Sequence, residues 1–509
     1  MTGGEVVLRL EKITKRFGDL VANDEVTLEL RRGELLALLG ENGAGKTTLM
    51  NILFGHYTAD SGQVSVFGRP LPPGQPRAAI EAGIGMVHQH FALANNLSVL
   101  ENVIAGTESI LRPRSDRAHA RAKLAGIAER FGLTVDPDAR VGELSVGERQ
   151  RVEILKALYR DARILILDEP TAVLTHQEAE RLYRTLRGMA AKGLSLIFIS
   201  HKLHEVLAAA DRVTVLRGGK VVAERPAAGT SRDELAELMI GRRVARPVRD
   251  QRAPGPVVMT ADGVDVVGGG VKRLSGISFT LRAGETLGII GVAGNGQAFL
   301  GELVSGLARP GAGRFELLGE AVTAPGPRRF VAAGVGRVPE DRNANGAVAE
   351  MTVWENAVLE RIRERRFSVA GLVKRAAGRA FARTVVERFD VRGGGPDTPI
   401  RLLSGGNMQK LILGRSLETA PRILIAAQPT RGLDEGAVVA IHAEILAARR
   451  AGTAVLLISE DLDEILELAD RVQAIVKGRL SPDIPIEEAD PRRLGLMMAG
   501  LWNETTDAA

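Results

Sequence analysis

A glycine-rich segment that begins at residue 40 has the residue types and the spacing of a phosphate site. Gly40-Glu-Asn-Gly-Ala-Gly-Lys-Thr47 follows the apolar stretch 34–39 and precedes a helical pattern over 48–54. Glycines let backbone N–H groups approach phosphate oxygens, and the N-terminus of the following helix adds partial positive charge. The alternative is a tight structural turn, but the context favours a site in which Lys46 binds phosphate and the Thr47 hydroxyl ligates Mg²⁺.

Two adjacent carboxylates follow another apolar stretch of the chain. Asp168 and Glu169 come directly after Ile164-Leu-Ile-Leu167, and the ligands of open α/β sheets gather at the carboxyl ends of strands. Alone, such a segment is more consistent with a helix-capping turn. Because it accompanies a phosphate segment, we expect Asp168 to hold Mg²⁺ and Glu169 to activate a water molecule for attack on a terminal phosphate.

The chain contains one long internal repeat. The segment 32–45 returns as 283–296 at an offset of 251 residues, and the segment 163–171 returns as 422–430 at an offset of 259. Landmarks that recur in the same order indicate a duplicated domain. The difference between 259 and 251 implies a net insertion of eight residues in the second copy, between these landmarks.

The elements that must position these residues follow from the apolar pattern. Each copy alternates short apolar stretches with helical patterns, which predicts an α/β fold with a mainly parallel sheet covered by helices. Stretches rich in charge and alanine, at about 90–160 and 341–418, predict a helical subdomain inserted in each core. The predicted buried strands are 34–39, 164–167, 195–199, 285–290, 422–426 and 454–458.

The stretch between the two copies reads as a linker. Residues 246–256 contain three prolines and lack apolar periodicity, a composition typical of a short, semi-rigid connection. The predicted organisation is therefore a first domain at 1–245, a linker at 246–256 and a second domain at 257–502.

The segment Leu144-Ser-Val-Gly-Glu-Arg-Gln150 lies just ahead of the strand that carries Asp168. Together with the phosphate segment, this pattern resembles the ATP-binding cassette (ABC) ATPases, in both copies and over nearly the whole chain. The resemblance implies two tandem P-loop ABC ATPase domains. Each would have a RecA-like α/β core, an inserted helical subdomain and an antiparallel β portion. It also implies ATP and Mg²⁺ as cofactors.

The resemblance assigns roles that spacing alone does not reveal. Phe17 resembles the aromatic residue that stacks on adenine, Gln89 the glutamine that senses Mg²⁺ and water, and His201 the switch histidine that contacts the γ-phosphate. The implied catalytic residues are Lys46, Gln89, Glu169 and His201, and the implied Mg²⁺ ligands are Thr47, Gln89 and Asp168. The implied ATP-binding residues of the first copy are Phe17, Gly40, Glu41, Asn42, Gly43, Ala44, Gly45, Lys46, Thr47 and Thr48.

The second copy lacks this chemistry. Gln297 and Ala298 occupy the positions of the lysine and the threonine, so a phosphate partner and a metal ligand are both missing. The remaining replacements are Ala427 for Asp168, Gln428 for Glu169, Glu340 for Gln89, Glu460 for His201 and Gly268 for Phe17. Loss of one oriented transition-state donor typically costs about 10²–10³ in rate, so we expect no measurable ATP hydrolysis at this degenerate site.

The second copy nevertheless keeps the full segment Leu403-Ser-Gly-Gly-Asn-Met-Gln409, whereas the first copy carries Val146 where a glycine usually stands. In the ABC family, two cassettes pack head to tail and each such signature segment completes the partner's phosphate site. The resemblance thus implies that Ser404, Gly405 and Gly406 complete the site of Lys46. One competent and one degenerate site follow, although a decaying second half is the alternative.

Composition excludes several classes of protein. The 509 residues include no Cys, which excludes disulfides, thiolate metal sites and a cysteine nucleophile. The net charge of +5, from 67 Lys plus Arg and 62 Asp plus Glu, is too dilute to indicate nucleic acid. The N-terminal residues do not resemble a signal peptide. No apolar stretch approaches the roughly 20 residues of a membrane-spanning helix, so we expect any membrane role to require a partner.

Two functions are consistent with this pattern: the motor subunit of a membrane transporter, and a soluble tandem ABC ATPase that acts on ribosomes or DNA. The short linker and the single intact site favour transport. Val338-Pro-Glu-Asp-Arg342 and Pro429-Thr-Arg-Gly-Leu-Asp434 resemble the ATP-binding subunit of bacterial simple-sugar and nucleoside importers, and 86–91 and 426–434 favour the nucleoside branch. The resemblance implies two integral-membrane permease subunits, an extracytoplasmic solute-binding protein or lipoprotein, and a peripheral location on the cytoplasmic face of the cell membrane. From the dilute charge we expect no nucleic acid partner.

Overall fold

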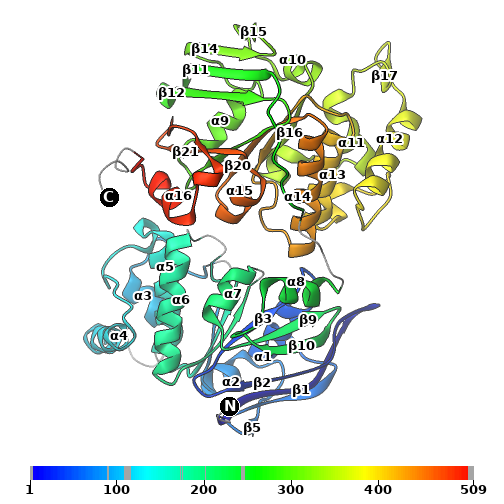
Figure 1. Ribbon diagram of the computed structural model, residues 1–509. Helices are drawn as coiled ribbons and strands as arrows, with labels where there is room; N and C mark the ends of the chain where they lie inside the picture. The colour runs from blue at the N-terminus through cyan, green and yellow to red at the C-terminus, as the bar shows by residue number, and fades with distance from the viewer. Residues whose placement is uncertain are drawn as a thin grey trace. The chain divides into compact units, whose positions relative to one another are not determined.

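The computed structural model describes residues 4–88, 91–107, 116–171, 174, 176–200, 202–241 and 247–502. The chain divides into two compact units, Met1–Val244 with Asp434–Gly436 and Ala245–Leu433 with Ala437–Ala509. Figure 1 labels the elements of both units.

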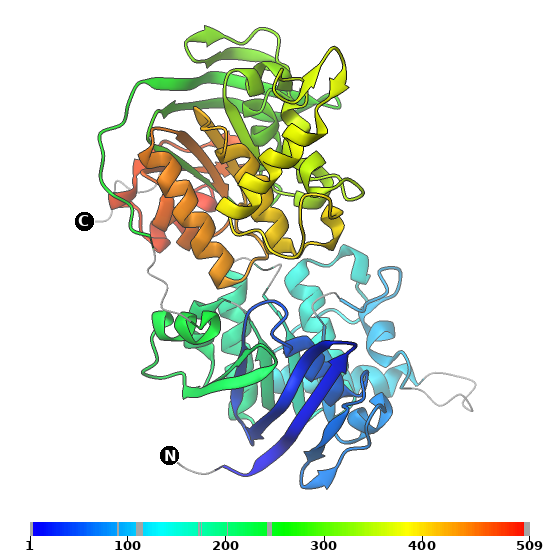
Figure 2. The ribbon, with the colours of Figure 1, turned by 90° about the vertical axis from the view of Figure 1, so that its right-hand side faces the viewer.

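The first unit contains two sheets. A four-stranded antiparallel sheet has the order β2-β1-β4-β5, and a six-stranded, mainly parallel sheet has the order β10-β9-β3-β8-β7-β6. The strands are β1 (Val6–Phe17), β2 (Leu20–Arg31), β3 (Leu35–Leu39), β4 (Ser61–Val66), β5 (Arg69–Pro70), β6 (Ile84–Val87), β7 (Ile164–Asp168), β8 (Ser195–Ile199), β9 (Arg212–Arg217) and β10 (Lys220–Pro226). Figures 1 and 2 show β1 and β2 as a layer beside the parallel sheet.

The helices of the first unit connect and cover these strands. They are α1 (Lys46–Phe54), α2 (Pro76–Glu81), α3 (Val99–Ile104), α4 (Arg117–Phe131), α5 (Val146–Tyr159), α6 (His176–Ala191), α7 (Leu203–Ala209) and α8 (Arg232–Ile240). Helices α3, α4 and α5 follow one another between β6 and β7, so they form the helical subdomain that the sequence predicts.

Both faces of the parallel sheet are buried. Along β3, Leu35, Ala37 and Leu39 pack in one apolar cluster, whereas Leu36 and Leu38 pack in another. Side chains of a strand alternate between the two faces of its sheet, so two cores require a continuous apolar run. This requirement explains why β3, β7 and β8 could be predicted from short apolar stretches.

The second unit repeats this architecture. Its sheets have the orders β12-β11-β14-β15 and β16-β19-β20-β13-β21-β22, with β23 paired to β21, and a separate hairpin joins β17 and β18. The strands are β11 (Val257–Gly268), β12 (Val271–Arg282), β13 (Thr286–Ile290), β14 (Ala312–Leu317), β15 (Glu320–Ala321), β16 (Val335–Val338), β17 (Ser368–Val369), β18 (Leu372–Val373), β19 (Ile423–Ala427), β20 (Ala454–Ser459), β21 (Arg471–Val476), β22 (Arg479–Leu480) and β23 (Ile484–Pro485). The helices are α9 (Gln297–Val304), α10 (Pro327–Ala332), α11 (Val353–Val358), α12 (Arg375–Arg388), α13 (Gly405–Leu417), α14 (Glu435–Arg450), α15 (Leu462–Leu468) and α16 (Pro491–Met498).

Two glutamates mark a small difference between the predicted and observed strands. Strands β3 and β13 begin one residue later than predicted, because Glu34 and Glu285 precede them. The carboxylate of Glu34 accepts a hydrogen bond from Arg212 Nε at 2.7 Å, and Glu285 accepts one from Arg471 Nε at 2.6 Å. These glutamates anchor the first parallel strand of each unit to an adjacent strand.

The stretch 247–256 contains no helix or strand, but it is tied to the second unit. The buried guanidinium of Arg449 pairs with Asp250 at 3.0 Å and with Asp470 at 2.7 Å. Arg249 also pairs with Asp470, at 2.9 Å. Ion pairs therefore hold this part of the linker against the second unit.

Within the described ranges, none of the helices is long and apolar enough to cross a lipid bilayer.

Candidate functional site

The phosphate segment lies between β3 and α1 of the first unit. Gly40, Gly43 and Gly45 have φ angles of 158°, 83° and 96°. A Cβ atom on Gly45 would lie 2.2 Å from the Ala22 carbonyl oxygen, and one on Gly40 would lie 2.4 Å from the Leu216 carbonyl oxygen. These positions accept only glycine, and the tight loop leaves the N-terminus of α1 as a site for anionic groups.

The side chain of Lys46 lies within this loop. Its ammonium donates hydrogen bonds to the carbonyl oxygens of Gly40 at 2.8 Å and of Glu41 at 2.9 Å, and 6% of the residue is exposed. Burial lowers the pKa of Lys46, while the nearby carboxylates of Glu169 and Asp168 oppose this shift. The cation is thus held by weak carbonyl partners, which phosphate oxygens can replace with charge-assisted bonds.

The two predicted carboxylates lie at the end of the buried strand β7. Burial, and then the charge of Glu169, raise the pKa of Asp168 to about 6, and Lys46 opposes the shift. Carboxylate and hydroxyl oxygens are the ligands that Mg²⁺ prefers, so Asp168 and Thr47 offer a fitting donor set. The described residues contain no cluster of three or more His, Cys, Asp or Glu side chains that could hold a metal ion. Mg²⁺ usually keeps substrate phosphates among its ligands.

The backbone at Glu169 adopts an uncommon conformation. Its φ angle is 45°, and its N–H donates to the Ile199 carbonyl oxygen of β8 at 3.1 Å. Gln428, at the matching position of the second unit, has a φ angle of 48° and donates to Ile458 at 2.7 Å. Left-handed non-glycine residues are uncommon and cluster at functional sites. The second unit keeps this backbone even though its carboxylate has become an amide.

Phe17 ends strand β1, and 44% of it is exposed. Its ring meets Tyr57 edge-on with 5.6 Å between centroids, and Lys15 Nζ lies 5.4 Å from its centroid. The paired strand β2 contacts the phosphate loop, because Asn23 Nδ2 donates to the Gly45 carbonyl oxygen at 3.2 Å. An exposed ring on a hairpin that contacts the loop can stack on a base. Gln89 and His201, also predicted for this site, lie outside the described residues.

A buried carboxylate links the segments after β7 and β8, and sequence reasoning missed it. Glu205 accepts hydrogen bonds from the hydroxyl groups of Thr171 at 2.6 Å, Tyr183 at 2.8 Å and Ser200 at 3.3 Å. The second unit repeats this network at an offset of 259 residues, because Glu464 contacts Thr430 at 2.6 Å and His442 at 3.3 Å. The shared offset was the signal that could have revealed it.

The degenerate site of the second unit carries amide and acidic side chains at the positions where the first unit has its predicted phosphate and metal partners. Gln297 is 7% exposed, and its Nε2 donates to the Val292 carbonyl oxygen at 2.7 Å. Arg431 pairs with Glu340 at 2.7 Å. Burial raises the pKa of Glu460, Arg431 lowers it and Glu340 raises it. Two acidic residues and an amide therefore stand where the first unit offers phosphate and metal partners.

At the position of Phe17 the second unit has Gly268, the last residue of β11. Ala298 follows Gln297 in α9, and Ala427 ends β19.

The signature serines cap helices in both units. Ser145 precedes α5, and its hydroxyl donates to Glu148 at 2.7 Å. Ser404 precedes α13, and its oxygen instead accepts a hydrogen bond from Asn407 Nδ2 at 2.9 Å. No described residue accepts a hydrogen bond from the Ser404 O–H, which lies next to the helix N-terminus formed by Gly405 and Gly406.

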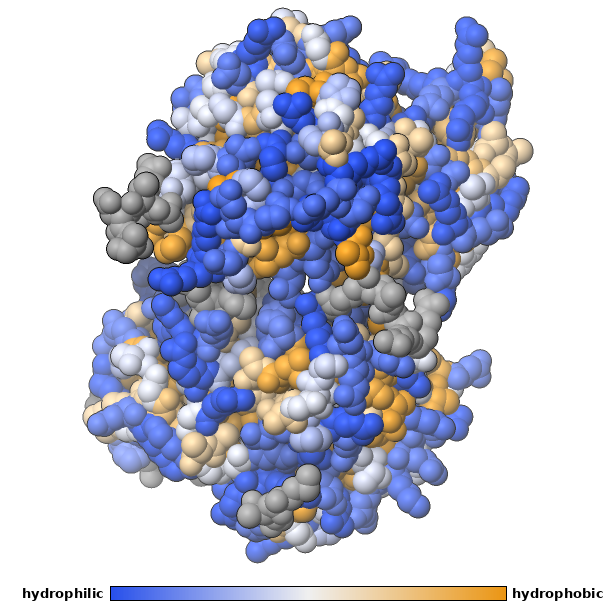
Figure 3. Space-filling view, in the orientation of Figure 1, coloured by the Kyte–Doolittle hydropathy of each residue, from blue (hydrophilic) through white to orange (hydrophobic). Residues whose placement is uncertain are grey.

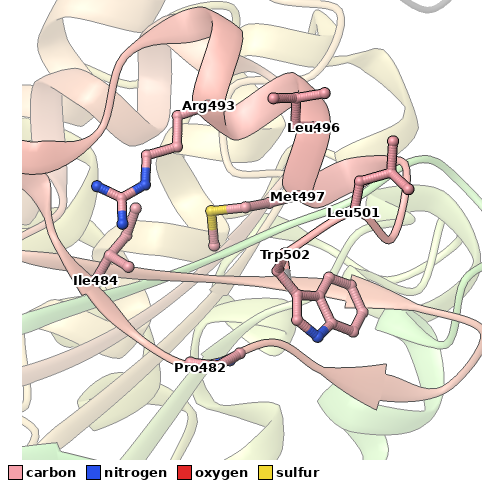
Figure 4. Close-up of a pocket in the computed structure, with 7 residues that line it drawn as sticks. All are labelled: Pro482, Ile484, Arg493, Leu496, Met497, Leu501 and Trp502. Carbon is pink, nitrogen blue, oxygen red and sulfur yellow. The ribbon is translucent and has the colours of Figure 1, made fainter. Parts of the chain in front are cut away.

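One cavity of the second unit is unrelated to these motifs. Its volume is about 110 Å³. Figure 4 shows its lining side chains, Pro482, Ile484, Arg493, Leu496, Met497, Leu501 and Trp502. None of them belongs to the phosphate loop, the carboxylate segment or the signature segment of that unit.

Comparison with known proteins gives the family. The protein-family model described as "ABC transporter" matches residues 23–172 and 274–431 of this chain. The chain belongs to the ABC transporter family. The predicted resemblance and the predicted tandem fold are thus confirmed, whereas the site residues remain predictions.

Curated relatives match nearly the whole chain. A glucose import ATP-binding protein of Haloferax volcanii is 45% identical over 99% of this chain and 98% of the relative. A nucleoside import ATP-binding protein of Lactococcus lactis is 44% identical, and a guanosine import ATP-binding protein of Bacillus subtilis is 42% identical, each over 97% of this chain and 98% of the relative.

Solved structures also resemble this chain over most of its length. An archaeal ribosome recycling factor, solved in complex with a ribosomal stalk protein, is 19% identical with a TM-score of 0.64. The similarity covers 96% of this chain and 92% of that one. At this identity the similarity concerns the fold alone.

Proposed function

We propose that this protein is the ATP-hydrolysing subunit of an importer that takes up nucleosides, or simple sugars, through separate membrane permeases. One observation carries the proposal. The first unit brings Lys46 of a tight glycine loop near the carboxylates of Asp168 and Glu169, in a chain whose relatives of matching length are named as import ATP-binding proteins.

The described residues of the first unit divide the reaction among them. Lys46 and the backbone N–H groups of its loop bind the phosphates, Phe17 stacks on the adenine, and Thr47 with Asp168 hold Mg²⁺. The bound Mg²⁺ would neutralise charge on the phosphate oxygens during transfer. Glu169 orients a water molecule and accepts its proton during attack on the γ-phosphate. Gln89 and His201 would complete the set.

The two halves have unequal roles in this proposal. The first domain, 1–245, hydrolyses ATP, and the second domain, 257–502, supports it through a linker at 246–256. The signature segment of the second domain, Ser404 with Gly405 and Gly406, completes the site of Lys46. The hydroxyl of Ser404 and the helix N-terminus behind it can both bind phosphate oxygens, which supports this role. The degenerate loop at Gln297 does not hydrolyse ATP.

The proposal also includes partners and a location. Two integral-membrane permease subunits would receive the motion of the ATPase, and an extracytoplasmic solute-binding protein or lipoprotein would deliver the solute. The subunit would then lie at the cytoplasmic face of the cell membrane. Nucleosides are the favoured solutes because two of the relatives carry nucleoside or guanosine in their names, while the glucose relative keeps sugars as the second candidate.

The test compares matched substitutions in the two halves. We expect Lys46→Ala and Glu169→Gln to lower ATP turnover at least about 100-fold, because each removes a group that acts on the transferring phosphate. The matched variants Gln297→Ala and Gln428→Ala should keep nearly normal turnover. Loss of turnover in Gln428→Ala would contradict the asymmetric assignment.

The solute is tested with the assembled transporter in lipid. Wild-type hydrolysis should rise when the permease and binding protein are present with a nucleoside, and sugars form the comparison. Hydrolysis that never responds to the permease would instead favour the soluble ATPase that acts on ribosomes or DNA.

A further inference from the structure

The β17–β18 hairpin lies in a segment of the second unit that is longer than the matching segment of the first unit. From the N-cap of α11 to the start of α12, Thr352 to Arg375, the chain advances 23 positions, whereas Ser98 to Arg117 of the first unit takes 19. The hairpin therefore lies within a segment that carries half of the predicted eight-residue insertion.

The hairpin has a defined shape. Ala370 and Gly371, its two turn residues, have φ angles of 49° and 81°, the combination that a two-residue type I′ turn requires. At its base, Lys374 N–H donates to the Phe367 carbonyl oxygen at 2.7 Å.

Aromatic packing anchors the base of this hairpin. Phe367 is 1% exposed and meets Phe381 of α12 edge-on, with 5.4 Å between centroids. The guanidinium of Arg366 lies 4.3 Å from the centroid of Phe367 and 4.6 Å from that of Phe381. This packing fixes the base of the hairpin, so its turn projects from a well-packed part of the unit.

The free end of the hairpin exposes apolar side chains. Leu372 is 77% exposed, Val369 is 50% exposed and Val373 is 43% exposed. A surface hollow with a volume of about 900 Å³ is lined by Val369 and Val373, together with Ile362. The space-filling view shows hydrophobic colour among hydrophilic surfaces at the hairpin labelled β17 in Figure 1 (Figure 3). A cluster of exposed apolar residues built on an inserted turn indicates a contact surface.

Cations surround these apolar residues. Arg363 and Arg365 line the hollow and are exposed. Lys374 and Arg375 follow β18 and are also exposed. Within 361–375, all of which the structure describes, the acidic residue is Glu364, which pairs with Arg361 at 3.0 Å. Hydrogen bonds from Thr352, and then the charge of nearby Arg375, lower the pKa of the Glu355 carboxyl of α11. The exposed end is therefore both apolar and strongly basic.

We propose that the β17–β18 hairpin docks on an anionic phospholipid surface. Basic side chains gain about 1 kcal/mol each near such a surface, and apolar side chains among them enter the interface between headgroups and acyl chains. Nucleic acid fits less well, because the aromatic rings of the hairpin are packed at its base and offer no stacking face. The inference rests on the proposed function in one respect, since an importer subunit works beside a membrane.

The test measures sedimentation of the full chain with vesicles, in the absence of permease. Vesicles of phosphatidylcholine are compared with vesicles that contain about one-third phosphatidylglycerol, at low and high salt. We expect wild type to bind the anionic vesicles and to dissociate at high salt. Arg363→Glu with Arg365→Glu should weaken binding at least roughly 25-fold, since about fivefold is lost per basic side chain. Leu372→Asp should also weaken binding.

Two matched variants serve as controls. Arg383→Glu reverses an exposed charge on α12, and Val267→Asp changes an exposed apolar residue on the β11–β12 hairpin. Both should bind vesicles like wild type, and every variant should keep its basal ATP hydrolysis.

Equal binding to neutral and anionic vesicles, or equal losses of vesicle binding in hairpin and control variants, would overturn the proposal. So would wild-type vesicle binding combined with loss of permease binding in the hairpin variants, which would identify a protein contact instead. Failure of ATP hydrolysis in wild type would contradict the proposed function and leave the vesicle result to be judged by itself.

Discussion

At the scale of single residues, Asp168 makes the free energy of unfolding depend on pH. Its pKa of about 6 lies above its ordinary value of 3.8, so the folded chain holds a proton that the unfolded chain releases. Its contribution to stability therefore falls as the pH rises from about 4 through about 6. Asp168→Asn removes this cost, and we expect it to stabilise the first unit by about 2 to 3 kcal/mol at pH 7.5 and hardly at all at pH 4.

Urea unfolding of the nucleotide-free protein at both pH values measures this effect. The control is Asp161→Asn, whose carboxylate is largely exposed, and which should change stability little at either pH. The same Asp168→Asn variant should lose Mg²⁺-dependent hydrolysis. Equal stabilisation at pH 4 and pH 7.5 would contradict the origin of the effect in the carboxylate.

Glu205 provides a second prediction at this scale. Its carboxylate joins Thr171, which follows Asp168 and Glu169 closely in the chain, to Ser200, which precedes His201. We expect Glu205→Gln to lower kcat about tenfold or more with little change in KM, because misplaced groups act mainly on the transition state. The matched variant Glu464→Gln changes the same network beside the degenerate site and should leave kcat close to wild type. Similar losses in both variants would show that the network supports stability alone.

Residue types and their positions in the chain led to the roles predicted for Lys46 and Asp168, and the structure places these two side chains near each other. Residue types did not predict the left-handed backbone at Glu169, because a φ of 45° follows from the bond of its N–H to Ile199 on the neighbouring strand. Nor did they predict Tyr183 and Glu205, whose hydroxyl and carboxylate meet only after α6 and α7 pack together.

At the scale of elements, the sequence predicted β3, β7, β8, β13, β19 and β20 to within a residue at each end. It did not predict the parallel strands β6, β9, β16 and β21. The apolar runs of the predicted strands are continuous because helices cover both faces of each sheet. The β17–β18 hairpin was not predicted, since strands of two residues are too short to show a period. The helical subdomains were predicted by composition, while their boundaries depend on capping residues such as Ser98 and Thr352.

The ion pairs that hold the linker against the second unit lead to a prediction about the stability of that unit. Asp470 accepts hydrogen bonds from Arg249 and from Arg449, and Arg449 is fully buried. We expect Asp470→Ala to destabilise the second unit by about 3 to 5 kcal/mol, because it leaves a buried cation without its main partner. Asp250→Ala should cost about 1 kcal/mol, since that carboxylate is half exposed. Thermal unfolding, monitored by hydrogen exchange at β13 and β21, measures the loss of stability in both variants. Equal losses in Asp470→Ala and Asp250→Ala would contradict this prediction.

At the scale of the whole molecule, the two units keep complementary parts of one chemical set. The first retains Lys46, Asp168 and Glu169, whereas the second retains a full signature segment with the uncommitted hydroxyl of Ser404. Neither half alone carries every group that the family resemblance assigns to a competent site. If both halves act on one ATP, damage to the second half should abolish hydrolysis in the first.

A matched pair of substitutions tests this dependence. Ser404→Arg places a long side chain at the N-cap of α13, and we expect turnover to fall nearly as far as in Lys46→Ala, about 100-fold or more. Ser145→Arg makes the same change at the N-cap of α5, which would serve only the degenerate loop, and should leave at least about half of the turnover, since it removes no group from the competent site. Both variants lose one helix cap worth about 1 kcal/mol, so unequal turnover cannot come from stability. Wild-type turnover in Ser404→Arg would mean that the first unit works without the second unit's signature segment.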